Sequence, residues 1–349
     1  MATLSKYEAG KRVTPSDDLV DALAQVLDFD RDFFFTPLTD EFADTECSFR
    51  RRTVTTERMK KRALAQGTLF AELVRFLANR VTLPTYRIPS IPTASVRDTE
   101  KTAERCRVEL GLPLDAPIGN MCRVLEPAGV AVTYLDAKTE QIDAFCRRGA
   151  TSVVVLNAVK GSTSRTRFDA AHELGHLVMH GDITSRSRDE VEREADSFAS
   201  AFLLPRAPLT RALYGRTRVD WPHFIELKRT WRVSLAAIVR RAFDLGLIDA
   251  VRYRQLNVSL HARGWHRGEP DEPPAERPEL IPLALRTLQT VTGESGANIC
   301  AQLHWRQPLF ESLTGVRFAE LQGDEPNQTV TKTSIVSLDD FRTRRSAGG

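Results

Sequence analysis

Residues 165–180 read RTRFDAAHELGHLVMH, and the five residues from His172 to His176 have the pattern H-E-x-x-H. Apolar residues recur at helical spacing through this stretch, which predicts an amphipathic helix. Residues four apart lie on the same face of a helix, so the imidazoles of His172 and His176 can bind one metal ion. Glu173 then points beside the ion, where its carboxylate can accept a proton from water. The pattern also occurs by chance in helices that bind no metal, but the amphipathic context favours a metal centre.

A second helix is predicted at Asp189–Leu204, ended by Pro205, and it offers the third ligand. A catalytic zinc site has three protein ligands and one position for water or substrate. Glu192 lies at helical spacing from Ala195 and Ala199 on the apolar face, so we expect it to turn toward the first helix. Glu194 is expected to face solvent. The sequence therefore predicts zinc bound by two histidines and Glu192.

The segments around these two helices indicate an α+β fold. Two short β-branched runs, Val130–Tyr134 and Ser152–Leu156, predict strands, and the segment Gln141–Cys146 lies between them. A helix is expected at Lys101–Leu110, and two more between Trp221 and Leu247, the second with Ser234 as its N-cap. We predict a mainly helical chain around a small-sheet, zincin-like peptidase core with helical flanking segments.

Composition shifts divide the chain into five segments. We expect a first helical segment at residues 1–36 and a basic helical linker at 37–92. The metallopeptidase core follows at 93–206, a helical segment at 207–268, and a linker with a weakly helical C-terminal region at 269–349. The stretch Gly268–Pro278 is rich in Pro and Glu and is predicted to be an exposed linker.

Overall composition places the chain among globular proteins. Of its 349 residues, 42% are hydrophobic and 27% charged, and the formal net charge is only +3, which does not favour nucleic acid binding by itself. Five cysteines are scattered without a C-x-x-C pair, which favours reduced thiols. The N-terminus has no apolar signal region, and no apolar run is long enough to span a membrane. We expect a cytoplasmic protein.

The two motif helices resemble a known family. The stretch RTRFDAAHELGH at 165–176, followed by EREADSFASAFLLP at 192–205, is similar to the ImmA/IrrE family of zinc metallo-endopeptidases. The resemblance implies that His172, His176 and Glu192 bind zinc, the gluzincin type of ligand set, and that Glu173 is the catalytic residue. Asp196 stands where the family more commonly has Asn, a difference not expected to reach the metal.

The family resemblance also implies a partner. Members are bacterial and phage-borne regulators that cleave a transcriptional repressor, so a repressor of the helix-turn-helix type is the expected substrate. The stretch SKYEAGKRVTPS at 5–16, with the helix after it, resembles the second half of an XRE-type helix-turn-helix domain that often precedes this peptidase. The sequence begins at what would be the end of the recognition helix of that module, so either the true start lies upstream of Met1 or the segment is a remnant. Residues 235–265 resemble the part that follows the peptidase in such fusions.

Two other classes of function stay open at this level. One is a DNA-binding transcriptional regulator with a non-catalytic zinc domain, and the other is a protein-interaction module. The basic run Phe49–Arg62 is a candidate for weak, non-specific contact with DNA phosphates, or is simply a solvated helix face. His180 is expected to satisfy the last carbonyl groups of its helix, with contact to a ligand histidine as the alternative. His180 and Tyr214 are candidates for stabilising an oxyanion, and Arg165 and Arg167 receive no role.

Overall fold

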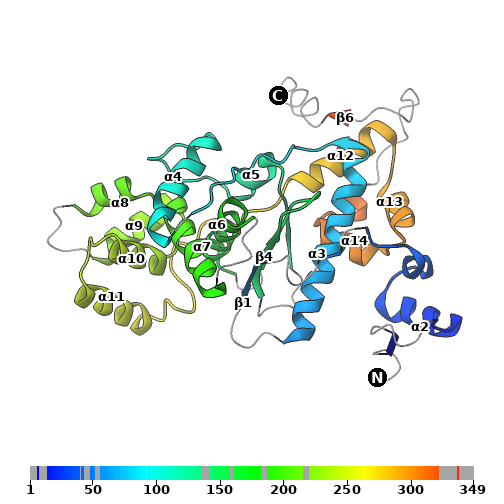
Figure 1. Ribbon diagram of the computed structural model, residues 1–349, viewed down its shortest axis with the longest axis horizontal. Helices are drawn as coiled ribbons and strands as arrows, with labels where there is room; N and C mark the ends of the chain where they lie inside the picture. Colours follow the sequence, from blue (N-terminus) through cyan, green and yellow to red (C-terminus); the bar gives the residue numbers. More distant parts are fainter. Residues whose placement is uncertain are drawn as a thin grey trace. The chain divides into compact units, whose positions relative to one another are not determined.

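The computed structural model describes most of the chain. It covers residues 6–7, 14–39, 41–42, 48–51, 56–93, 95–135, 142–157, 161–181, 187–214, 220–321 and 336–337. The chain forms two compact units, each built from separate stretches of sequence. The larger unit comprises Phe42–Ala71 and Pro84–Leu280, and the smaller one comprises Met1–Glu41, Glu72–Leu83 and Ile281–Gly349. The architecture is α+β with helix predominating, as predicted (Figure 1).

The larger unit contains one four-stranded mixed sheet with the strand order β1-β4-β5-β3. β3 is parallel to β5, whereas β4 is antiparallel to both β5 and β1. The two strands predicted before the H-E-x-x-H helix form where the sequence indicated them, and the segment between them is also a strand. Their bounds are β1 Ser48–Arg51, β3 Ala131–Tyr134, β4 Ile142–Arg147 and β5 Val153–Leu156.

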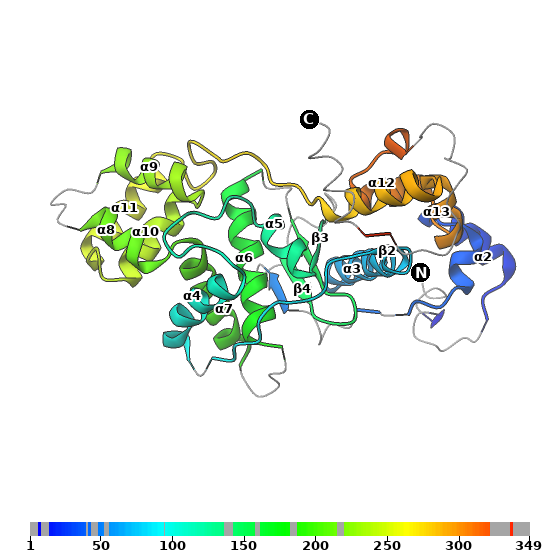
Figure 2. The ribbon, with the colours of Figure 1, turned by 90° about the horizontal axis from the view of Figure 1, so that it is seen from above.

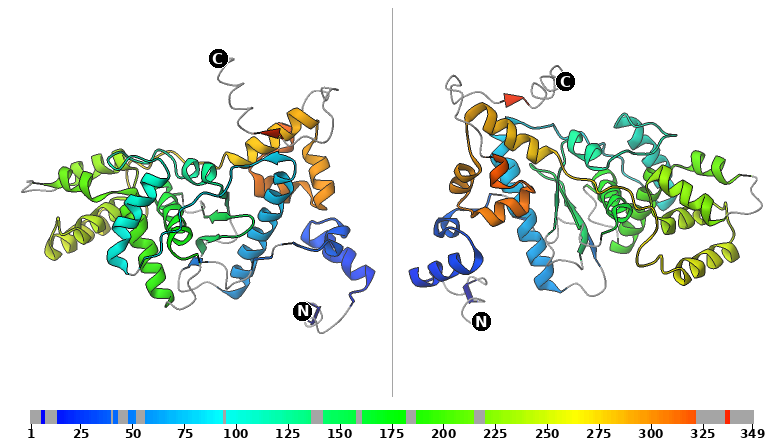
Figure 3. Two further views of the ribbon diagram at one scale, coloured as in Figure 1. Left: turned by 45° about the horizontal axis from the view of Figure 1, so that its top comes forward. Right: turned by 180° about the vertical axis from the view of Figure 1, so that it is seen from behind.

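The H-E-x-x-H stretch lies in α6, which packs against β4 and β5 (Figure 3). α6 in turn packs against α7, and α4 packs against α7. Both predicted helices are confirmed to within two residues at each end. The side chain of Ser162 caps α6, and Ser187 with Glu190 forms a capping box at the start of α7, so both helices begin where side chains satisfy the first amide groups. The bounds of the three helices are α4 Thr99–Glu109, α6 Thr163–Met179 and α7 Arg188–Leu203.

α6 and α7 approach closely at Gly175. A Cβ atom added there would lie 3.0 Å from Cδ1 of Phe198 and 3.4 Å from the Cα of Ala195. Phe198 is completely buried and stacks on Phe202, with 5.5 Å between ring centroids. The glycine therefore sets how near the two motif helices can lie.

Four further helices group together on the other side of α7 from the sheet (Figure 2). Ser234 accepts a hydrogen bond from the amide of Ala237 and caps α10, as predicted. Asp220 and Asp249 cap α9 and α11 in the same way. These helices are α8 Arg206–Leu213, α9 Trp221–Trp231, α10 Leu235–Asp244 and α11 Ala250–Ala262. A continuous buried apolar cluster joins them to α6, α7 and the sheet. The short elements η3 Val96–Asp98, α5 Cys122–Leu125 and η4 Glu126–Ala128 complete this unit.

The smaller unit is mainly helical, and the C-terminal region contains better-formed helices than the weak sequence signal suggested. Among the described residues it holds two helical segments near the N-terminus, three helices near the C-terminus and a short parallel pair of strands. The elements are α2 Asp17–Leu27, η1 Arg31–Phe35, β2 Val81–Thr82, α12 Leu280–Thr292, α13 Gly296–Leu303, α14 Gln307–Thr314, η6 Phe318–Leu321 and β6 Val336–Ser337. The long helix α3 Glu57–Ala78 contributes residues to both units.

The predicted exposed linker Gly268–Pro278 is extended chain, but the prediction that it is merely exposed is wrong. Its three glutamates, Glu269, Glu272 and Glu276, turn inward and bind groups of the larger unit. We call residues 268–279 the strap (Figure 2). Four prolines hold the strap extended, so side chains three and four residues apart reach successive helices.

None of the helices within the described ranges combines the length and the apolar composition needed to cross a lipid bilayer.

Candidate metal centre

Three side chains from two helices converge beside the sheet. His172 and His176 come from α6 and Glu192 comes from α7, and their ligand atoms all lie within 4.8 Å of one another. The two Nε2 atoms are 3.0 Å apart. Glu192 Oε2 lies 3.3 Å from Nε2 of His172, and Oε1 lies 3.7 Å from Nε2 of His176. This cluster is compatible with a metal ion.

Burial distinguishes the members of this cluster. His172 is 1% exposed and His176 is 3% exposed, whereas the Glu192 side chain retains 27% exposure. Glu173 is completely buried, and its backbone carbonyl lies 3.6 Å from Sγ of Cys146 on β4. In such a setting a carboxylate attracts a proton more strongly than it does in water, because electrostatic interactions are stronger away from bulk water.

Asp196 fixes the orientation of the first histidine. Its Oδ1 lies 2.9 Å from Nδ1 of His172. A carboxylate accepts hydrogen bonds and does not donate them, so Nδ1 of His172 carries the proton and Nε2 presents its lone pair to the cluster. Sequence spacing alone does not predict this contact, because it depends on how α7 lies against α6.

A second chain of contacts fixes the other histidine. Glu194 Oε2 lies 3.0 Å from Nε2 of His180, and Nδ1 of His180 lies 3.0 Å from Nδ1 of His176. The same reasoning about carboxylates places a proton on Nε2 of His180, so its Nδ1 accepts the proton of His176 Nδ1. The Nε2 lone pair of His176 is then also directed at the cluster.

Two expectations for these residues are corrected. Glu194 was expected to face solvent, yet it is 1% exposed, and it reaches His180 and Thr93. The favoured expectation that the His180 side chain satisfies helix carbonyls is wrong; its ring contacts His176 and Glu194, which is the alternative left open by the sequence. The apolar stripe of α7 is wider than the sequence pattern suggested, because α6 covers one side of the helix and α4 covers another.

Other residues singled out from the sequence lie elsewhere. Tyr214 is 82% exposed at the end of α8 and shows no contact with the cluster. Arg165 forms an ion pair with Asp143, with 3.1 Å between the charged groups. Of the basic run, Arg52 lies outside the described residues, and Lys60 is buried rather than available to a ligand. The proposed helix-turn-helix remnant also falls partly outside the described residues.

The strap holds the first half of α6, the helix that carries the H-E-x-x-H residues. Glu272 accepts hydrogen bonds from the amide and hydroxyl of Ser164 at the start of α6, at 3.0 and 2.8 Å. Lys228 Nζ, which is completely buried, lies 2.6 Å from Glu272 and 2.8 Å from Glu269. Glu269 also accepts from the amide of Leu235 in α10 at 2.7 Å.

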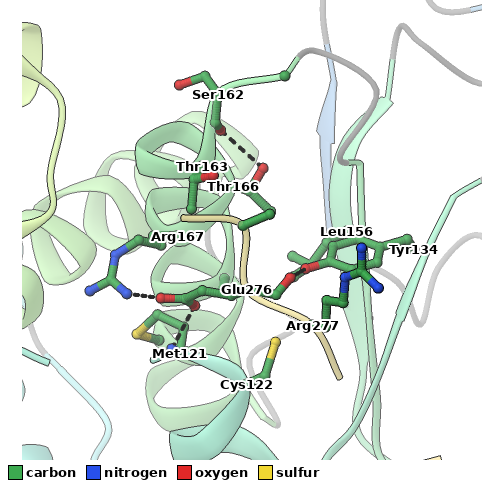
Figure 4. A pocket seen from close by; sticks show the side chains of 13 residues that line it. Met121, Cys122, Tyr134, Leu156, Ser162, Thr163, Thr166, Arg167, Glu276 and Arg277 are labelled. Carbon is green, nitrogen blue, oxygen red and sulfur yellow. Dashed lines mark hydrogen bonds and ion pairs between the residues drawn. The ribbon is translucent and has the colours of Figure 1, made fainter. Parts of the chain in front are cut away.

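Glu276 is the third inward-turned glutamate of the strap, and Figure 4 shows it between Arg167 and Met121. It forms an ion pair with Arg167 of α6, and it accepts a hydrogen bond from the amide of Met121 at 2.7 Å. Arg167 is 1% exposed, and burial lowers the pKa of its guanidinium to about 10, which still leaves it charged at neutral pH. A cavity of about 240 Å³ lies beside this pair, lined in part by Cys122, Tyr134 and Thr166.

The geometry therefore defines a class of protein: a metallopeptidase-like domain in which an H-E-x-x-H helix and a glutamate helix converge. Residues 125–243 match the family model of peptidase family M78, described as the IrrE N-terminal-like domain. This match supports the ImmA/IrrE resemblance over the core, and with it a metallopeptidase of that type. The match does not extend to the N-terminal segment. A search among curated proteins found no match.

Proposed function

We propose that this protein is a zinc-dependent, site-specific endopeptidase that cleaves a partner protein. The observation that carries the proposal is the convergence of His172, His176 and Glu192, with Glu173 following the first ligand directly in α6. The hydrogen bonds behind both imidazoles direct their Nε2 lone pairs to one point. Two lone pairs 3.0 Å apart repel each other unless a cation accepts both, so the donor set favours a bound metal.

The donor set suits zinc. Zinc prefers imidazole nitrogen and carboxylate oxygen in tetrahedral sites, with bonds of about 2.0–2.2 Å, which place neighbouring ligand atoms about 3.3 Å apart. The distances of 3.0, 3.3 and 3.7 Å among the three donors are close to that value. Three protein donors also leave a fourth position of the tetrahedron for water or substrate.

When bound, zinc supplies Lewis acidity, which polarises a peptide carbonyl and makes water a better nucleophile near neutral pH. The residues of the chain handle the proton. Glu173 accepts it from the attacking water and returns it to the departing amine, so the carboxylate acts first as a base and then as an acid. Asp196 and the Glu194–His180 pair hold the two imidazoles in position during this exchange.

The substrate we propose is a transcriptional repressor of the helix-turn-helix type, in bacterial or phage regulation within the cytoplasm. Support comes from the ImmA/IrrE resemblance of residues 165–176 and 192–205, and from the family match at residues 125–243. A peptidase with one defined target acts as a switch, because cleavage removes the repressor irreversibly.

Co-expression with a helix-turn-helix repressor, chosen first from any small repressor gene found beside this one, tests the proposal. The zinc-loaded wild type should yield repressor fragments. Glu173→Gln should retain zinc and yield none, whereas His176→Ala should lose both zinc and cleavage. Glu226→Gln, a change in an exposed pair with Arg229 on α9, is the matched control and should cleave normally. Undiminished cleavage by Glu173→Gln would overturn the assigned role.

The same proteins distinguish the proposed endopeptidase from the two competing functions. A DNA-binding regulator with a non-catalytic zinc domain would bind operator DNA in a salt-sensitive way and leave the repressor intact. A protein-interaction module would hold the repressor in a stable complex without fragments. Fragments that depend on zinc and on Glu173 support the endopeptidase.

A further inference from the structure

A groove in the larger unit lies next to the metal centre, although none of the three candidate ligands lines it. Its volume is about 1660 Å³, and its walls come from α6, α7, α10, α11 and the segment before α4. Asp196, which contacts His172, lines the groove. Arg165 and Asp169 also line it, and both lie on the face of α6 that carries His172 and His176, because residues three, four and seven apart share a helical face. A chain in the groove would therefore lead to the metal-binding residues.

Several carboxylates of this groove are paired within the protein, although Asp196, which contacts the neutral His172, keeps its charge. Glu100 forms an ion pair with Arg241 at 2.5 Å, and Asp244 does so with Arg240 at 2.9 Å. Glu272 and Glu269 share the single positive charge of the buried Lys228. The groove therefore keeps some negative charge at this pair and at Asp196, whereas Glu100 and Asp244 are compensated by arginines.

Several positive charges of the groove are not compensated in this way. Arg97, Arg193 and Arg267 line it and are exposed, and none forms an ion pair with another residue in the described ranges. Arg193 follows the ligand Glu192 directly in α7. Two exposed imidazoles, His261 and His266, stack on the same wall with 4.8 Å between their centroids. The groove thus offers separated cations to a ligand that carries negative charge.

We propose that this groove is the docking surface for an acidic, extended segment of the protein substrate, which it guides to the metal centre. The inference rests on the proposed endopeptidase function and adds the substrate's charge. Hydroxyl groups of Ser197, Ser200 and Ser234 also line the groove and can bond to a peptide backbone. The interspersed carboxylates repel the closely spaced phosphates of a nucleic acid, whereas Asp and Glu side chains can meet the isolated arginines singly.

Binding can be measured without turnover on the full-length Glu173→Gln protein. The probe is a fluorescein-labelled decapeptide of alternating Glu and Ser, and its fluorescence anisotropy reports binding. The comparison peptide has Gln in place of each Glu. We expect the acidic peptide to bind more tightly, and its Kd to rise with salt concentration, because exposed charges are screened.

Charge reversal identifies the surface. Arg97→Glu combined with Arg193→Glu should weaken binding of the acidic peptide at least about fivefold at low salt, since each exposed pair contributes modestly. Arg254→Glu is the matched control. Arg254 is exposed on α11 but does not line the groove, and its reversal should leave Kd within about twofold. Circular dichroism of all variants checks that they remain folded.

Three results would overturn the proposal: equal binding of acidic and neutral peptides, equal weakening by the control reversal, or tighter binding of a ten-nucleotide single strand than of the acidic peptide. Failure of the docking proposal is distinct from failure of the proposed function. Repressor cleavage that persists at full rate in the Arg97/Arg193 double variant removes the docking surface and keeps the peptidase. Peptide binding without any repressor cleavage by the zinc-loaded wild type keeps the docking surface and removes the peptidase.

Discussion

Glu194 and His180 form a buried hydrogen bond, with 3.0 Å between the carboxylate Oε2 and the imidazole Nε2. His180 in turn orients His176, because the Nδ1 atoms of the two histidines lie 3.0 Å apart. The carboxylate thus determines which nitrogen of His176 presents its lone pair to His172 and Glu192, although it does not itself belong to that cluster. The H-E-x-x-H pattern identifies the candidate ligands. The chain of hydrogen bonds from Glu194 through His180, which we call the relay, explains the orientation of the His176 ring.

The relay predicts that Glu194→Ala lowers zinc affinity by about 10- to 100-fold, because His180 loses the partner that sets its tautomer. Zinc affinity is measured by competition with a chromophoric chelator. His180→Ala should have a similar effect, and the double variant should be little worse than either single one, since the two residues act through one chain of bonds. Asp189→Asn, an exposed change on the same helix, should bind zinc as the wild type does. Additive losses in the double variant would contradict the relay.

The sequence predicts the ligands but not the residues that orient them, and the reason is physical. His172, His176 and Glu192 follow from helical spacing, which is a local property. Glu194 also lies on α7, but its burial depends on how α6 and α4 pack around that helix, which no local pattern contains. If α7 is considered against α6 alone, its apolar pattern places Glu194 in solvent. The division of the chain into five segments is a prediction that the contacts within the two units do not test.

The strap shows the same limit at a larger scale. Proline and glutamate in Gly268–Pro278 predict an exposed linker, and no helix or strand forms there. The partners of its glutamates are Lys228 and Arg167, which lie 41 and 109 residues away in the sequence. A lysine and an arginine inside otherwise core-forming helices are the signal that could have indicated a buried acidic partner, because cations of this kind are rarely buried unpaired.

Gly175 gives a second prediction, on the spacing of the motif helices. Gly175→Ala should destabilise the protein by about 1–3 kcal/mol, despite the better helix propensity of alanine, because the new methyl group meets Phe198 at 3.0 Å. Phe198 is completely buried and has no room to retreat. Displacement of α7 also moves Glu192, so zinc affinity should fall with stability. Urea unfolding and zinc competition measure the two effects.

Gly268→Ala is the control for that experiment, because nothing lies within 4 Å of the Cβ position at Gly268. Its free energy of unfolding should change by less than about 1 kcal/mol. If Gly175→Ala proved as stable as the wild type with unchanged zinc affinity, the close approach would not control the geometry of the metal centre.

A third prediction concerns the ion pair between Glu276 and Arg167. Glu276→Gln should lower the free energy of unfolding by about 3 kcal/mol, because it leaves a guanidinium that is 1% exposed without its counter-charge. Three backbone carbonyls also bind Arg167, which limits the loss. Glu226→Gln removes an exposed pair instead and should cost less than about 1 kcal/mol. Equal losses in the two variants would show that burial of the strap pair adds nothing.

Acid stability provides the fourth prediction, through Glu272. Burial raises the pKa of this carboxyl group, but hydrogen bonds from Lys228 and Ser164 outweigh it, so the pKa in the folded protein lies below the ordinary value of 4.5. A carboxyl group whose pKa falls on folding stabilises the folded state above its unfolded pKa. That contribution disappears as the pH drops through the folded pKa. Glu272 should therefore stabilise the protein at neutral pH and lose this effect in acid below 4.5.

The measurement is urea unfolding of the wild type and Glu272→Gln between pH 7 and pH 3, with metal removed by chelator so that ligand protonation does not contribute. The variant should be less stable at pH 7, and the difference should shrink as the pH falls. For Asp189→Asn, at an exposed position on α7, the free energy of unfolding should change with pH in parallel with that of the wild type. A stability difference that stays constant down to pH 3 would mean that the Glu272 carboxylate charge plays no part in holding the strap against α6 and Lys228.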